Sequence, residues 1–135
     1  MSRLTHPLLA YAYLVDRIKD DIEEFWVIAL DANKDIIDSQ CLFRGTVDQC
    51  LFHPRDVFRF ACLKNASAIL VAHNHPSGNT QPSPHDIQIT EQLVMVSRLM
   101  QIAIIDHLII GADSYYSFME AGQLEIKAPA WPYDP

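Results

Sequence analysis

The chain has 135 residues, half of them hydrophobic, which fits a single domain over 1–135 with a substantial core and excludes a disordered or coiled-coil protein. Its formal net charge is −7, so the chain lacks the excess of positive charge that supplies most non-specific affinity for DNA. Strong binding of nucleic acid is therefore not expected. No apolar run reaches the roughly 20 residues that a membrane-spanning helix needs, so no association with a membrane is predicted.

The first part of the chain predicts a helix followed by an antiparallel pair of strands. Apolar residues recur at helical spacing over 7–22, so a leading helix is expected within 1–21. The continuous apolar run Phe25–Leu30 suits a strand that is buried on both faces. Turn-forming residues at 31–35 then connect it to a partner strand at Ile36–Phe43.

The remainder of the chain alternates helices with strands, which predicts an α/β or α+β fold. The expected elements are a helix at 55–65, a strand at 68–72, a polar loop at 73–84, a helix from there to about residue 100, and closing strands at 102–110 and 115–118. The tail 128–135 contains three prolines and is expected to be loose.

Cysteine usage indicates the cellular compartment. Cys41, Cys50 and Cys62 form an odd set with no CxxC spacing, so a disulfide framework is not expected. Free cysteines that pack as small hydrophobic residues are typical of reducing conditions. We therefore predict a cytoplasmic protein.

The chemically informative stretch is 73–78, His-Asn-His-Pro-Ser-Gly. His73 ends a buried strand, and the imidazole of His75 can point the same way if the chain stays extended, which the following Pro76 favours. Asp86 arrives from the first turn of the next helix. Two histidines and one carboxylate leave an open fourth position on a tetrahedral zinc, the pattern of catalytic rather than structural sites. The spacing thus predicts one zinc per chain.

A metal-activated water also needs a base, and two glutamates lead into the first strand. Because successive strand residues face opposite sides, only one of Glu23 and Glu24 can face the metal, and spacing alone does not choose between them. Ser83 lies at a helix N-cap with Asp86 three residues on, as in a capping box. An alternative interpretation is therefore that these two residues only cap the helix and that the histidines bind no metal.

These residues resemble the JAMM signature of the JAB1/MPN metalloprotease superfamily: an upstream Glu, then His-x-His-Pro, then Ser-x-x-Asp. The similarity to its RadC branch covers about 22–122. It consists of His-Asn-His-Pro-Ser-Gly at 73–78, Pro-Ser-x-x-Asp at 82–86, Asp-His-Leu-Ile-Ile-Gly at 106–111, Leu-Phe-x-Gly-Thr at 42–46, His-Pro-Arg at 53–55 and Asn-Ala-x-Ala-Ile at 65–69. Full-length RadC proteins add an N-terminal helix-hairpin-helix region, and this chain resembles short, stand-alone members without it.

The resemblance implies a fold, a metal and a reaction. The fold is an α/β sandwich, a mixed sheet flanked by helices and related to that of cytidine deaminases. The family pattern implies zinc bound by its two histidines and its aspartate, and hydrolysis of a peptide or isopeptide-like substrate. Its Glu-x-Phe register selects Glu23 as general acid/base, and its serine, here Ser83, would hydrogen-bond the tetrahedral intermediate. The pair Asp106-His107 lies within the pattern without an assigned role.

Two rival functions follow from the same residues. The first is a metal-stabilised accessory domain in DNA repair or mobile-element function that hydrolyses nothing, although retention of every ligand favours catalysis. The second is a zinc deaminase, which would need His-x-Glu followed by Pro-Cys-x-x-Cys, and the sequence has neither. The string His-Asn-His at 73–75 does not indicate the nuclease motif of the same letters, whose residues lie far apart in sequence.

Overall fold

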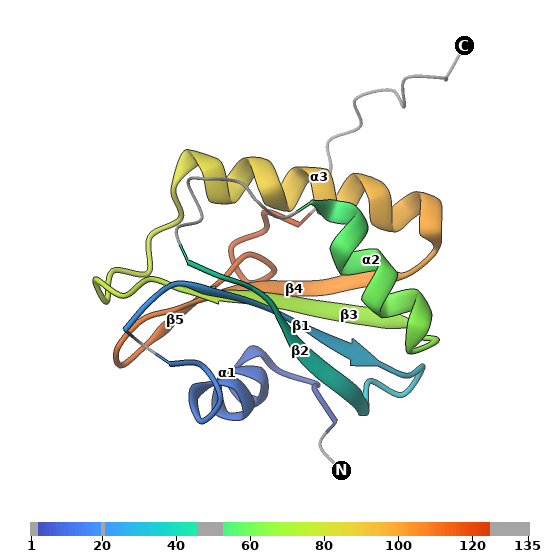
Figure 1. The fold of residues 1–135 in the computed structure, drawn as a ribbon, viewed down its shortest axis with the longest axis horizontal. Helices are drawn as coiled ribbons and strands as arrows, with labels where there is room; N and C mark the ends of the chain where they lie inside the picture. The colour runs from blue at the N-terminus through green and yellow to red at the C-terminus, as the bar shows by residue number, and fades with distance from the viewer. Residues whose placement is uncertain (1–2, 20, 46–52, 125–135) are drawn as a thin grey trace.

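A five-stranded mixed sheet runs through the molecule, with one helix on one face and two helices on the other (Figure 1). The computed structural model describes residues 3–19, 21–45 and 53–124. The elements are α1 (Pro7–Val15), β1 (Glu24–Leu30), β2 (Ile36–Arg44), α2 (Pro54–Leu63), β3 (Ala68–Asn74), α3 (Pro84–Met100), β4 (Ala103–Ile110) and β5 (Tyr115–Ser117). The predicted class, a mixed sheet flanked by helices, is confirmed.

The strands β1 and β3 lie at the centre of the sheet because they are apolar along almost their whole length. All seven residues of β3 are buried, and so are six of the seven in β1. Strands of this kind need cover on both faces. One core cluster packs the sheet against α2 and α3 through Val57, Phe58 and Leu93, and a second packs it against α1 through Ala10 and Leu14.

The strand order β2-β1-β3-β4-β5 brings the start of β1 next to the end of β3. These two strands are antiparallel, with Phe25 opposite His73. Strand β4 is parallel to β3 on the other side, so that Asn74 lies opposite Ile110. The residues before β1 and those after β3 therefore meet at the same end of these two strands, although about 50 positions separate Glu24 from Asn74.

The leading helix is shorter than predicted. It ends at Val15, about two turns before its expected end. Two backbone N–H groups that follow the helix both bond to the carbonyl of Leu14, which closes its last turn. The buried side chain of Asn74 then binds the carbonyls of Lys19 and Ile22. These tertiary contacts draw the chain away from the helical path that its apolar spacing favours.

The strand before the histidines is longer than predicted. β3 continues two residues past Ala72, because β1 and β4 both pair with His73 and β4 also pairs with Asn74. The polar loop therefore starts at His75. Every other element that was predicted begins and ends within two residues of its expected bounds.

Other expectations meet the structure only in part. Cys41 and Cys62 are free thiols, whereas Cys50 and the tail 128–135 lie outside the described residues. Thr46, the last residue of one RadC-like motif, also lies outside them. In the part of the chain that the structure describes, no helix combines the length and apolarity needed to cross a membrane.

Candidate metal centre

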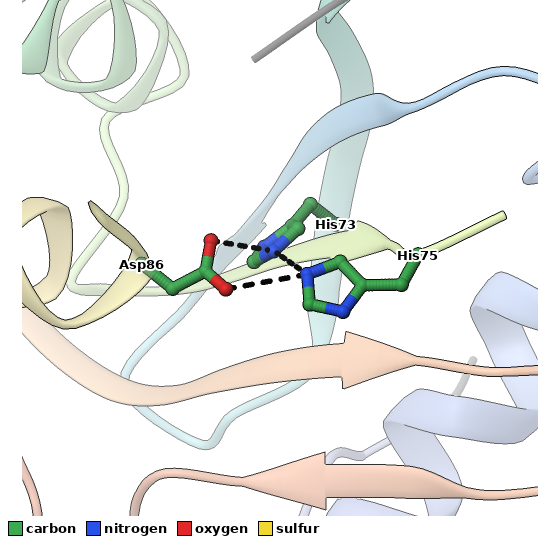
Figure 2. A group of neighbouring side chains, drawn as sticks. All are labelled: His73, His75 and Asp86. Carbon is green, nitrogen blue, oxygen red and sulfur yellow. Dashed lines mark hydrogen bonds and ion pairs between the residues drawn. The ribbon is translucent and has the colours of Figure 1, made fainter. Parts of the chain in front are cut away.

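The three predicted ligands converge on one point. Figure 2 shows the side chains of His73, His75 and Asp86 turned toward one another. The Nε2 atoms of the two histidines are 3.1 Å apart. The carboxylate of Asp86 places Oδ1 at 3.0 Å from Nε2 of His73 and Oδ2 at 3.2 Å from Nε2 of His75. Two imidazole nitrogens and one carboxylate thus face a common space.

Local structure accounts for this convergence. The chain stays extended for one residue past β3, where the N–H of His75 still bonds to the carbonyl of Ile110 at 3.0 Å, so His73 and His75 turn to the same side of the sheet. Asp86 lies in the first turn of α3, where the capping box fixes it: Ser83 Oγ accepts from the backbone N–H of Asp86 at 3.1 Å, and Asp86 Oδ2 accepts from the N–H of Ser83 at 2.7 Å. The predicted capping box is therefore confirmed, and the same carboxylate also faces both histidines.

The donor set fits a small divalent cation. Zn–N bonds of about 2.0–2.1 Å place neighbouring ligand atoms of a tetrahedral site about 3.3 Å apart. The separations observed here are 3.0–3.2 Å. Nδ1 of His75 lies 2.7 Å from the carbonyl oxygen of Asn79, which can only accept, so the neutral ring keeps its lone pair on Nε2. His73, His75 and Asp86 could therefore bind a metal ion.

An ion pair forms in the same space when no cation is bound. Burial favours a raised pKa for Asp86, but the close contacts of the carboxylate with His73 and His75 outweigh burial and hold the pKa of this carboxyl well below its usual range. The hydrogen bond to Asp86 is also the main cause of the raised pKa of His75, although burial opposes it. Since metal ligands must be deprotonated, a cation has to displace the proton of His75.

This competition predicts a pH dependence of stability. Because the folded-state pKa of His75 is raised, its contribution is fully present below its unfolded pKa of about 6.5 and is lost as the pH rises through the folded pKa. Metal-free protein should therefore become less stable above about pH 6.5. Zinc-saturated protein should show the opposite trend, because zinc competes with that proton.

Urea unfolding of both forms between about pH 6 and 9 measures this difference. The matched control is metal-free His75→Asn, which lacks the titrating imidazole. If the free energy of unfolding of the metal-free wild type has the same pH slope as that of the variant, the pair formed by His75 and Asp86 does not stabilise the fold.

The two glutamates before and in β1 have different surroundings. The carboxylate of Glu24 is buried and accepts hydrogen bonds from Arg44 Nε and Trp26 Nε1, each at 2.8 Å. Glu23 comes immediately before β1, two residues ahead of Phe25, whose ring stacks on that of His73 with centroids 6.2 Å apart. The charge of Glu23 also raises the pKa of His75. This geometry favours Glu23, whose role as a base stays a prediction.

Asn74 is a residue whose importance the sequence analysis missed. Its side chain is 3 % exposed and points to the sheet face opposite that of the flanking histidines. Oδ1 accepts from the N–H of Glu24 at 2.7 Å, and Nδ2 donates to the carbonyls of Ile22 at 3.1 Å and Lys19 at 3.3 Å. These bonds hold the backbone on both sides of Glu23. A signal was available, since an asparagine at the end of an apolar strand needs partners once buried.

Comparison with known proteins identifies the family. A family model described as a RadC-like JAB domain matches residues 4–123. The chain belongs to the RadC family. Similar proteins include UPF0758 proteins of Symbiobacterium thermophilum (42 % identical over 90 % of this chain and 52 % of the relative), Thermotoga maritima (39 %, 91 % and 55 %) and Staphylococcus aureus (36 %, 91 % and 57 %). The chain spans about half the length of these curated relatives.

Two glycines of the RadC motifs shape the loop after β3. Gly78 has φ +86°, a conformation that side chains rarely adopt. A Cβ on Gly111 would lie 2.6 Å from both the carbonyl oxygen of Gly78 and Cγ2 of Thr80, so only glycine permits this close approach. The loop held in this way carries Asn79, whose carbonyl orients the ring of His75. Both glycines therefore support the candidate metal centre.

Proposed function

We propose that this RadC-like domain is a zinc-dependent hydrolase that cleaves peptide, isopeptide or related amide bonds. The convergence of two imidazole nitrogens and one carboxylate, from His73, His75 and Asp86, carries this proposal. Zinc suits imidazole and carboxylate ligands in tetrahedral geometry, and sites with three protein ligands are the catalytic kind. The neutral Nε2 of His75 and the ionised Asp86 supply the charge state that a divalent cation prefers.

The chain supplies groups for each proton transfer. Zinc, when bound, lowers the pKa of a coordinated water towards about 7 and polarises a substrate carbonyl. Glu23 acts as the general base that takes the proton of the attacking water, and it returns this proton to the leaving amine. Glu23 lies just before β1, next to the end of β3 that carries His73, which is consistent with contact between its carboxylate and the metal centre. Glu24 is already bonded to Arg44 and Trp26.

Ser83 stabilises the charge that develops on the substrate oxygen. Its Oγ accepts the backbone N–H of Asp86 at 3.1 Å, a contact that does not use the hydroxyl proton. That proton is donated to the oxyanion, an effect for which loss of one donor costs about 3 kcal/mol of transition-state stabilisation. The N-cap therefore aligns the serine beside the aspartate ligand.

Removal of zinc tests this function directly. Zinc-loaded protein is screened against internally quenched peptides and isopeptide-linked peptides, and stripping with a chelator is expected to abolish turnover. Adding back about one zinc per chain should restore it. The control is His75→Ala, which should purify without stoichiometric zinc and without activity. Retained zinc in this variant would refute the ligand set, and stoichiometric zinc without any turnover would support a metal-stabilised accessory domain instead.

A further inference from the structure

A third histidine lies behind the candidate metal centre. His107 on β4 places Nε2 at 2.9 Å from Nδ1 of His73, the ring nitrogen that faces away from the other ligands. Nδ1 of His107 is 2.6 Å from Oγ1 of Thr90 on α3. Thr90 in turn donates to the backbone carbonyl of Asp86 at 2.8 Å. All of these side chains are at most 4 % exposed, so water does not share these bonds.

The direction of each hydrogen bond in this series follows from the bond between Thr90 and the carbonyl of Asp86. The carbonyl of Asp86 can only accept, so it uses the single proton of the Thr90 hydroxyl. Thr90 Oγ1 must then accept from Nδ1–H of His107. The ring of His107 is buried, and its two nitrogens meet His73 and Thr90, neither of which carries a negative charge, so the ring is neutral and Nε2 carries no proton. His73 therefore donates from Nδ1, which leaves the lone pair on Nε2 facing His75 and Asp86.

We propose that Thr90 and His107 are positioning residues that fix His73 in the one neutral tautomer able to bind a metal ion. This inference rests on the metal centre of the proposed function. A histidine ligand generally donates its second ring N–H to a neighbouring group, which sets its tautomer and orientation. Here that neighbour is another histidine, whose own proton is placed by a hydroxyl on α3.

The ring of His107 is also fixed in orientation. It stacks on Phe118 with centroids 4.7 Å apart and an interplanar angle of 11°, and Phe25 meets its edge at 5.9 Å. These contacts hold Nε2 toward His73 and away from His75 and Asp86. His107 therefore acts through His73 and is not a fourth ligand, which preserves the three-ligand pattern of a catalytic site.

Loss of the Thr90 hydroxyl removes the acceptor that places the proton of His107. In metal-free protein the proton of His107 then moves to its Nε2, and this N–H donates a hydrogen bond to Nδ1 of His73. The proton of His73 lies on its own Nε2, the atom that would bind a metal ion. Metal binding has to reverse both tautomers and leave a buried N–H of His107 without an acceptor, which is costly. The Thr90 hydroxyl thus affects metal affinity indirectly, through His107 and His73.

Thr90→Val tests the inference because it removes the hydroxyl and keeps the side-chain shape. Its zinc dissociation constant, measured by competition with a chromophoric chelator, is expected to rise about 10–100-fold. Long-range 1H–15N spectra of the metal-free protein should show His73 change from the Nδ1–H to the Nε2–H tautomer. Thr90→Ser should restore both properties. Ser97→Ala, which removes another buried hydroxyl of α3, should change neither.

The outcomes separate this inference from the proposed function. A Thr90→Val protein with wild-type zinc affinity and His73 still protonated on Nδ1 would overturn the inference. If the wild type binds no zinc, the metal centre fails, while the spectra still report the tautomers.

A second pair of variants keeps the test decisive if Thr90→Val does not fold. His107→Gln offers an amide oxygen near the position of Nε2, whereas His107→Leu offers no acceptor. We expect tighter zinc binding by the glutamine variant. Equal zinc affinity of the two variants would contradict a positioning role for His107.

Discussion

Replacing Glu23 with glutamine is expected to lower kcat by about 10²–10⁴-fold while the zinc content stays at that of the wild type. Glutamine has nearly the same shape but cannot accept the proton of the attacking water. The backbone on both sides of Glu23 is held next to the end of β3, because Asn74 bonds to Ile22 and Glu24. Steady-state kinetics on the best amide substrate from the screen, together with metal analysis of the same preparations, measure both quantities.

Glu24→Gln is the matched control, since it changes the adjacent carboxylate in the same way. Its side chain is bonded to Arg44 and Trp26, so this variant should keep its turnover and lose part of its stability with the 2.8 Å ion pair to Arg44. Wild-type turnover by Glu23→Gln would remove that residue from the mechanism. A larger loss of turnover in Glu24→Gln would reverse the assignment.

The parts of the site that the sequence predicted well depend on short-range geometry. The two histidines share a face because the chain stays extended from the end of β3 to His75, and residues two apart in an extended chain point the same way. The position of Asp86 follows from a helix that starts at Ser83 and Pro84, with the capping box three residues on. For the same reason, most helix and strand bounds were within two residues of those expected.

The parts that the sequence did not predict depend on contacts between distant residues. His73 and His107 are 34 positions apart, and their contact requires the parallel register of β3 and β4, which no local pattern fixes. The hydrogen bond that engages Glu24 likewise comes from a distant residue, Arg44, which is 20 positions away. The segment after the shortened α1 also makes contacts of this kind, since Asn74 of β3 binds the carbonyls of Lys19 and Ile22.

Replacing Asn74 with alanine is expected to destabilise the fold by about 2–4 kcal/mol, because one buried side chain loses three hydrogen bonds. The freed backbone lies on both sides of Glu23, so turnover should fall as well. The zinc ligands are on the opposite face of β3, and their pairing with β1 and β4 is intact, so zinc content should be kept. Urea unfolding, metal analysis and kinetics on one preparation measure the three effects.

The control for general destabilisation is Ser97→Ala. Ser97 is buried on α3 and donates to the carbonyl of Val94 at 2.6 Å, so its loss should cost about 1 kcal/mol of stability and leave turnover unchanged. A drop in turnover confined to Asn74→Ala would then reflect the placement of Glu23 rather than a weaker fold. Wild-type turnover in Asn74→Ala would mean that Glu23 keeps its position without this side chain, and that the central residue of His73-Asn74-His75 serves stability alone.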